Sequence, residues 1–211
     1  MRKNQVVLLV GLFSLFTYFS PSPALAETAV YDASFTAPRC SIGDSPCVVG
    51  SALINGRGPL GPEPNNGASP YNKNTIAASP CADGPSGTYH VDESLDAFTM
   101  TSLSDPRYFF PGDTIEVSAT VWCYTTSQNR LAVFTADMVE PINWTYQGSA
   151  ACPASGQQTL KLEFPLSRHL GEQVIRVAFT YSSLAAPCDT GYYNDRDDVV
   201  ITTVSDLDRD G

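Results

Sequence analysis

Apolar and polar residues alternate along much of this chain, and the alternation predicts β-strands. The clearest case is 115–122, where the odd positions are apolar and the even ones mostly polar, as in a strand with one buried face. Segments 159–164 and 174–181 alternate similarly, and only 165–170 hints at a helical turn. The other expected strands are 28–36, 48–54, 97–103, 131–135, 142–146 and 199–204. About nine short strands predict an all-β fold, a single two-sheet β-sandwich of jelly-roll or immunoglobulin-like type.

The first 26 residues have the pattern of a secretion signal. Arg2 and Lys3 precede an almost continuous apolar run at 6–19, and an A-x-A-type site ends at Ala26. The run is too short for a good membrane span. We expect cleavage after Ala26 rather than an N-terminal helix retained in the fold. The sandwich domain then covers 27–204, an acidic tail covers 205–211, and no transmembrane segment remains.

The expected mature chain is strongly acidic. Its 185 residues carry ten Lys and Arg against 22 Asp and Glu, a net charge of −12. Such a surface repels phosphate backbones and anionic lipid head groups. Nucleic acid is therefore excluded as a partner, whereas export to a calcium-rich medium fits this charge.

All six cysteines lie in the expected mature chain, and an even number behind a secretion signal indicates disulfides. Of the fifteen pairings that six cysteines allow, we favour Cys40–Cys47 as a local loop, Cys123–Cys152 across neighbouring strands and Cys81–Cys188 as a long closure. The alternative is a zinc site. The absence of any C-x-x-C pair and the isolation of the two histidines argue against zinc.

Two acidic clusters, 92–96 and 195–198, each stand next to an apolar stretch and follow a cysteine. Hard oxygen ligands of this kind suit calcium, so we predict one calcium site and one disulfide joining two ends of the sandwich. In a strand, Asp195 and Asp197 share a face while Asp198 points away. Solvated turns are the alternative. The candidate ligands are Asp92, Glu93, Asp96, Asp195, Asp197 and Asp198.

The chain ends in 206–211, DLDRDG, which has the opening half of a calcium-binding loop. The distal half, with its bidentate Glu, does not follow in this sequence. An acidic tail is the simpler interpretation.

Motifs for catalysis are missing from the sequence. It has no G-x-S-x-G, no H-E-x-x-H and no glycine-rich phosphate loop after a strand. His90 lies two positions from Asp92 and is expected to hydrogen-bond beside the acidic site. We therefore predict a non-catalytic protein, and a polysaccharide hydrolase that uses a carboxylate pair stays as an alternative.

Four aromatic residues are candidates for contact with a ligand: Trp122, Trp144, Tyr192 and Tyr193. The expected partner is an extracellular glycan or protein, or further copies of the chain. A role as a structural subunit of an appendage or surface layer is a second alternative.

The segments 81–96 (CADGPSGTYHVDESLD) and 191–200 (GYYNDRDDVV), together with Cys188, carry a resemblance to a known type of module. The chain resembles a poorly characterised cysteine-bearing β-sandwich module appended to secreted bacterial peptidases and other exported proteins. The resemblance implies a non-catalytic role, with the acidic motifs and cysteines as signature, although no peptidase precedes the module here. The last six residues resemble the start of a thrombospondin type 3 or dockerin-like calcium repeat.

Overall fold

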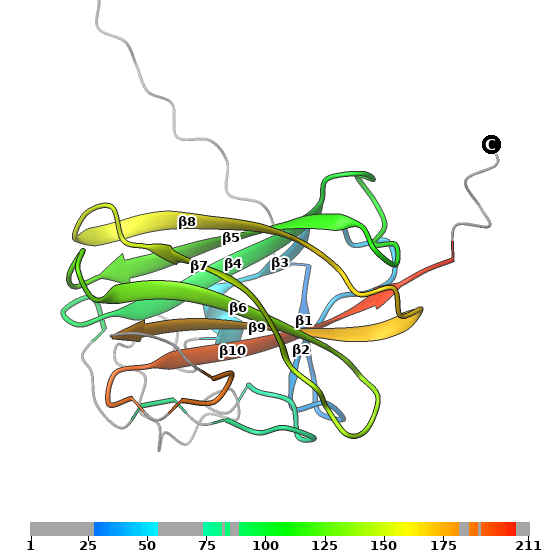
Figure 1. Cartoon of the computed structure of the whole chain (residues 1–211), viewed down its shortest axis with the longest axis horizontal. Helices are drawn as coiled ribbons and strands as arrows, with labels where there is room; N and C mark the ends of the chain where they lie inside the picture. The colour runs from blue at the N-terminus through cyan, green and yellow to red at the C-terminus, as the bar shows by residue number, and fades with distance from the viewer. Residues whose placement is uncertain are drawn as a thin grey trace, which may run out of the picture.

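The chain folds into two packed β-sheets, as the alternation predicted (Figure 1). The structure is a computed structural model that describes residues 28–54, 74–81, 83–84, 89–181, 186–189 and 191–205. The expected secretion signal at 1–26 and the acidic residues 206–211 lie outside the described residues.

Ten strands and one short helix make up the described part of the chain. In chain order they are β1 (Val30–Asp32), β2 (Ala37–Arg39), β3 (Cys47–Val49), α1 (Ser51–Ile54), β4 (Ser94–Ser102), β5 (Thr114–Cys123), β6 (Asn129–Asp137), β7 (Thr145–Ala151), β8 (Gly156–Pro165), β9 (Gly171–Tyr181) and β10 (Asp195–Thr203).

The large sheet has the strand order β1-β2-β10-β9-β6-β7, and the small sheet has the order β3-β4-β5-β8. Within β4 to β10, the first, second and fifth strands lie in the small sheet, and the other four lie in the large one. The hairpin β9–β10 pairs over nine residues, from Asp195 opposite Phe179 to Thr203 opposite Gly171.

The core fills the space between the sheets. Alternation along β5 turns Ile115, Val117 and Ala119 inward, and alternation along β9 turns Ile175 and Val177 to meet them. A second apolar cluster lies on the outer face of the large sheet, where Val174 and Val200 are covered by Ile76. The large sheet is therefore buried on both faces around β9 and β10.

The structure corrects several predicted boundaries. β10 begins at Asp195, four residues before the expected strand, because the acidic residues themselves pair with β9. The expected strand 48–54 is divided into β3 and α1, β7 lies later than 142–146, and 28–36 is strand only over β1. Segment 165–170 contains no helical turn. The first residues of β10, 195–198, are polar but buried. A polar run normally indicates an exposed turn, so the sequence pattern placed the start of this strand too late.

All three predicted disulfides are present. Their Cα–Cα distances are 5.9 Å for Cys40–Cys47, 5.6 Å for Cys81–Cys188 and 6.1 Å for Cys123–Cys152, and the described residues contain no free cysteine. Three disulfides in one domain are typical of an oxidising compartment. No helix in the described ranges has the length and apolar character needed to cross a membrane.

Candidate functional site

The first half of β10 places charged side chains on both faces of the large sheet. Val199 belongs to the core between the sheets, and Val200 belongs to the cluster on the outer face. By alternation, Asp195 and Asp197 therefore turn inward and Asp198 turns outward. The sequence-based expectation that Asp198 points away from the other two is confirmed.

On the outer face, Asp198 forms a buried ion pair with Arg176 of β9. Arg176 Nε donates to Asp198 Oδ1 over 2.7 Å, and Nη2 donates to Oδ2 over 2.9 Å. Both residues are 0% exposed. The backbone N–H of Ile76 donates to Asp198 Oδ2 as well, over 2.8 Å. Burial raises the pKa of Asp198, and the hydrogen bonds from Arg176 oppose that rise.

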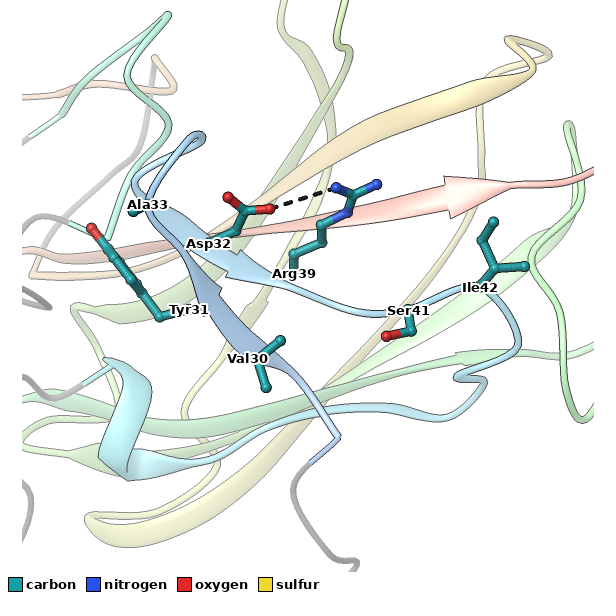
Figure 2. A pocket seen from close by; sticks show the side chains of 7 residues that line it. All are labelled: Val30, Tyr31, Asp32, Ala33, Arg39, Ser41 and Ile42. Carbon is teal, nitrogen blue, oxygen red and sulfur yellow. Dashed lines mark ion pairs between the residues drawn. The ribbon is translucent and has the colours of Figure 1, made fainter.

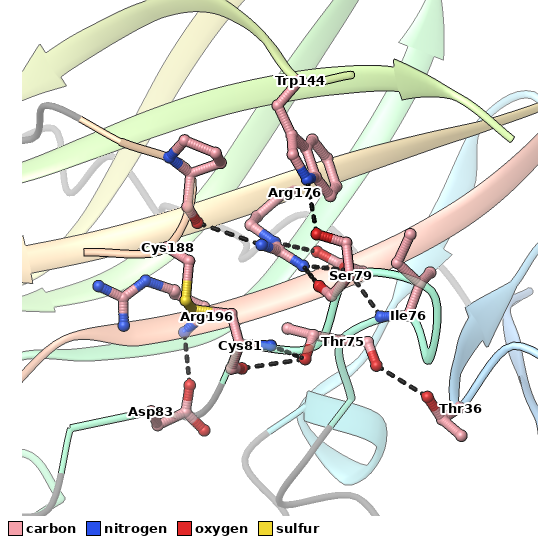
Figure 3. A network of polar contacts seen from close by, with 12 residues as sticks. Thr36, Thr75, Ile76, Ser79, Cys81, Asp83, Trp144, Arg176, Cys188 and Arg196 are labelled. Carbon is pink, nitrogen blue, oxygen red and sulfur yellow. Dashed lines mark hydrogen bonds and ion pairs between the residues drawn. A yellow bond between two sulfur atoms is a disulfide. The ribbon is translucent and has the colours of Figure 1, made fainter. Parts of the chain in front are cut away.

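The remaining donors of Arg176 are also used (Figure 3). Nη1 donates to the carbonyl oxygen of Pro187 over 3.2 Å, and Nη2 donates to that of Ser79 over 2.7 Å. The guanidinium lies 4.3 Å from the centre of the Trp144 ring, whose Nε1 donates to Ser79 Oγ over 2.9 Å. The two charges thus neutralise each other, and all three nitrogens of the guanidinium are hydrogen-bonded, which is the condition under which a buried charge is tolerated.

On the inner face, Asp197 has no such partner. The residue is 0% exposed, and neither carboxylate oxygen accepts a hydrogen bond from the described residues. Burial, followed by the charges of Asp195 and Asp83, raises the pKa of Asp197 well above its usual range. Asp195 lies on the same face of β10, and its Oδ2 accepts the backbone N–H of Leu95 on β4 over 2.7 Å.

Two loop residues bring further oxygen atoms to this place. Asp83 Oδ1 accepts the backbone N–H of Arg196 over 2.8 Å (Figure 3), and burial with the charge of Asp195 raises the pKa of Asp83 well above its usual range. Asn74 is 0% exposed, and its Oδ1 accepts no hydrogen bond in the described structure. Its Nδ2 donates to the carbonyl oxygens of Leu53 and Ile54. The Asn74 side chain also lies near Asp197 and lowers the pKa of that carboxyl, but by less than burial and the neighbouring carboxylates raise it.

The first acidic cluster, 92–96, approaches the second cluster, 195–198, through one residue, and its other acidic side chains have separate surroundings. Glu93 is buried, and burial raises its pKa, with a smaller contribution from Asp195. The Asp96 carboxylate is instead hydrogen-bonded to His90 Nε2 at 2.9 Å and to Ser94 Oγ at 2.8 Å. Asp92 is partly exposed. Glu93 is therefore the member of the first cluster whose charge acts on the same place as that of Asp195.

His90 is stacked between two aromatic rings. Its ring centre lies 3.8 Å from that of Tyr89 and 4.6 Å from that of Trp122, with interplanar angles of 18° and 14°. His90 has a φ of 58°, in the left-handed region that non-glycine residues seldom adopt. Its bond is to Asp96 rather than to the predicted neighbour Asp92, and it fixes the start of β4 against β5.

The four aromatic candidates do not gather into one surface. Trp122 lies under His90 on the small sheet, whereas Trp144 covers Arg176 on the outer face of the large sheet. Tyr192 is 72% exposed, and Tyr193 is 38% exposed and packs edge-on against Tyr181 with ring centres 6.0 Å apart. Only these two neighbouring tyrosines share a location.

Two open clefts lie away from the acidic residues of β10. The larger, about 660 Å³, is formed by β1, β2 and the residues after β2; it contains an ion pair between Asp32 and Arg39 at 3.5 Å (Figure 2). Arg39 also binds Glu172 at 2.8 Å. Hydrogen bonds from Ser34 lower the pKa of Asp32. The smaller cleft, about 360 Å³, lies beside His169. Charges in the larger cleft are paired with each other.

Sequence reasoning missed three residues of this region: Asn74, Asp83 and Arg176. Asn74 and Asp83 come from irregular segments, and their only sequence signal is proximity to Cys81. Arg176 occupies an outward position of an alternating strand, where a solvated charge is the normal expectation. The covering segment, 74–81, turns this position into an interior one.

Within the described ranges, no group of three or more His, Cys, Asp or Glu side chains is already gathered closely enough to hold a metal ion. Comparison with models of known protein families gives no match, and a search of curated proteins finds no relative.

Proposed function

We propose that this chain is a secreted, non-catalytic, calcium-binding β-sandwich module that acts in extracellular binding, adhesion or assembly. The observation that carries the proposal is the Asp197 carboxylate, fully buried and without a hydrogen bond in the described structure. An isolated ionised carboxylate in a protein interior costs several kcal/mol. A bound cation removes that cost and keeps the group ionised at neutral pH.

Calcium fits the atoms that surround Asp197. The oxygen donors around Asp197 are its own carboxylate, the carboxylates of Asp195 and Asp83, and the amide oxygen of Asn74. Calcium accepts six to eight carboxylate, amide and carbonyl oxygens in flexible geometry, whereas zinc prefers Cys and His. Glu93 lies close enough to Asp195 to add charge. Asp92, Asp96 and Asp198 are left outside the proposed ligand set.

Arg196 does not substitute for the cation. It is adjacent to Asp195 and Asp197 in sequence, but alternation places its side chain on the opposite face of β10. There it is buried, which lowers its pKa, and it donates to the carbonyl oxygen of Asp189. The charge of Arg196 still interacts with Asp83 and Asp195 and offsets part of their negative charge. One guanidinium beside the three carboxylates of Asp83, Asp195 and Asp197 leaves an excess of negative charge.

The proposed role of calcium is to fasten the two sheets and the covering segment at one end of the sandwich. Its ligands come from β10 and from residues on both sides of Cys81, and Asp195 also binds β4. Exposed groups such as Tyr192 and Tyr193 then remain free for a glycan or protein partner. The enclosed position of the carboxylates, away from both described clefts, favours a structural ion over a hydrolytic carboxylate pair.

Thermal unfolding of the oxidised protein tests the proposal. In metal-free buffer, added Ca²⁺ should raise Tm reversibly, and an excess of chelator should return it to the starting value, because a ligand that binds only the folded state stabilises it. Mg²⁺ at the same concentration is the control for ionic strength and should have a much smaller effect. An unchanged Tm at millimolar Ca²⁺ would contradict calcium binding.

A further inference from the structure

The Cys81–Cys188 disulfide lies between two of the proposed cation ligands and the sheet that carries the others. We infer that this disulfide controls the affinity of the cation site, so that reduction of one bond weakens calcium binding. The inference rests on the proposed function and concerns the regulation of the same site. It assigns to one of the three disulfides a task that the other two do not share.

The first step concerns the ligands outside β10. Asn74 and Asp83 both belong to the Cys81 segment, by which we mean residues 74–81 and 83–84. Thr75 Oγ1 donates to the carbonyl oxygen of Cys81 and accepts its N–H, both over 2.9 Å, so the segment folds tightly around the cysteine. Cys81 is therefore one of the anchors that position both ligands, together with the hydrogen bonds of Asn74 to Leu53, Ile54 and the backbone of Asp198.

The second step concerns the other half of the bridge. Cys188 is flanked by Pro187 and Asp189, whose carbonyl oxygens accept hydrogen bonds from Arg176 and Arg196 of the large sheet. Figure 3 shows the disulfide between Cys81 and Cys188 beside Arg196. The disulfide thus joins the Cys81 segment to a loop that is anchored on β9 and β10. It closes 107 residues, against 29 and 7 for the other two bridges, and longer closure restrains the chain more strongly.

The third step concerns the contact between the segment and the turn before β10. Gly84 N–H donates to the carbonyl oxygen of Asn194 over 2.7 Å. A Cβ atom at Gly84 would collide with the backbone of Tyr192, so the backbone of the Cys81 segment and that of the turn before β10 are in direct contact. Loss of the bridge would leave only non-covalent contacts to hold Asp83 beside Asp195, among them the hydrogen bond from the Arg196 N–H to Asp83, and the site would be less well ordered.

The reaction that breaks the bridge is ordinary thiol–disulfide exchange. A thiolate of dithiothreitol attacks one sulfur of the pair and forms a mixed disulfide, and its second thiolate closes the oxidised six-membered ring. Two electrons pass from the dithiol to the protein, and Cys81 and Cys188 are released as thiols. Because coupling between two equilibria is reciprocal, calcium must oppose this reduction as strongly as reduction opposes calcium binding.

Calorimetric titration with Ca²⁺ tests the inference on three proteins: the natural chain, the pair C81A/C188A and the control pair C40A/C47A. Cys40 lies beside Val200, farther along β10 than the acidic residues. We expect Kd to rise at least about tenfold in C81A/C188A, within the usual range of coupling energies, and to change less than about threefold in C40A/C47A. Equal Kd values in all three folded proteins would overturn the inference.

Reduction of the natural chain gives an independent test that needs no variant to fold. Mass spectrometry after alkylation follows each cysteine pair during exposure to dithiothreitol, with Ca²⁺ or with Mg²⁺. We expect Ca²⁺ to shift the equilibrium between oxidised and reduced Cys81–Cys188, measured against a fixed ratio of reduced to oxidised dithiothreitol, at least about tenfold toward the disulfide, and to leave Cys40–Cys47 unaffected. Calcium binding without selective protection would overturn the inference and leave the proposed function intact, whereas no calcium binding at all would remove both.

Discussion

Asp197 and Asp198 are adjacent on β10 and are both 0% exposed, yet their surroundings are opposite. Asp198 receives two hydrogen bonds from Arg176 and one from the backbone of Ile76. Asp197 receives none from the described residues and lies near two further carboxylates. Both pKa values are raised by burial, but only at Asp198 does a guanidinium oppose the rise.

The comparison shows that a carboxylate is buried on each face of β10, but that its charge is compensated differently on the two faces. The outer face carries its own counter-ion, so its stability depends on the chain alone. The inner face needs a proton or an ion from solution, so we expect its stability to depend on pH and, under the proposed function, on calcium. Variants that remove one carboxylate at a time should separate these behaviours.

The largest effect is expected from Asp198→Asn. This change leaves Arg176 buried without its counter-ion, and breaking a buried pair costs about 3–5 kcal/mol. Urea unfolding should show this loss of free energy of unfolding in calcium and in metal-free buffer alike. A loss confined to the calcium condition would place Asp198 among the ligands and contradict its role as the partner of Arg176.

A smaller and conditional effect is expected from Asp197→Asn. At a calcium concentration of 100 times Kd, binding should stabilise the natural protein by about 2.7 kcal/mol, and the variant should lose this gain. In metal-free buffer the variant should be at least as stable as the natural protein. The amide of asparagine has nearly the same shape as the carboxylate of aspartate but carries no charge, so the cost of burying a charge is removed. Equal destabilisation in both buffers would show that Asp197 is a structural residue only.

The pH dependence of the metal-free protein should follow the raised pKa values of Asp83 and Asp197. A carboxyl whose pKa is higher in the folded state than its unfolded value of about 3.9 stabilises the fold fully below that value, and the contribution is lost as pH rises through the folded pKa. The difference in Tm between D83N/D197N and the natural protein should therefore grow in favour of the variant from pH 4 to pH 8. Saturating calcium should abolish or reverse that trend.

The smallest effect is expected from Trp144→Phe. Phenylalanine keeps a ring over Arg176 but loses the hydrogen bond to Ser79 and part of the cation–π attraction, which together amount to about 1 kcal/mol. Tyr192→Phe, at a residue that is 72% exposed, is the matched control and should change the free energy of unfolding by less than about 0.5 kcal/mol. The two variants together test whether Trp144 stabilises the buried pair.

Much of this architecture follows from local pattern. Alternation is sufficient to identify β5, β8 and β9, and it also places Asp195 and Asp197 opposite to Asp198. The pairs favoured from the sequence are the ones formed, and Cys40 and Cys47 enclose a turn as expected. Cys123 and Cys152 do not join neighbouring strands, however: Cys123 ends β5 of the small sheet and Cys152 follows β7 of the large sheet, so this bridge links the two sheets. These features need no knowledge of what covers the sheets.

The ligand geometry does not follow from local pattern, because it depends on tertiary covering. Arg176 is interior only because residues distant in sequence fold over β9, and Asn74 and Asp83 lie in segments without periodicity. Asp96 is diverted to His90, and the register shift between Leu95 and Ala97 marks where β4 departs from regular pairing with β5. Neither event has a signal in the alternation of apolar residues.

Direct measurement of calcium stoichiometry tests the central claim most closely. Calorimetric titration of metal-free protein should give one strongly bound Ca²⁺ per chain for the natural protein and for Asp92→Asn, which changes a partly exposed acid of the first cluster. The same titration of Asp197→Asn should show no strong site. Absence of strong binding by the natural protein, or unchanged binding by the folded Asp197→Asn variant, would contradict the account.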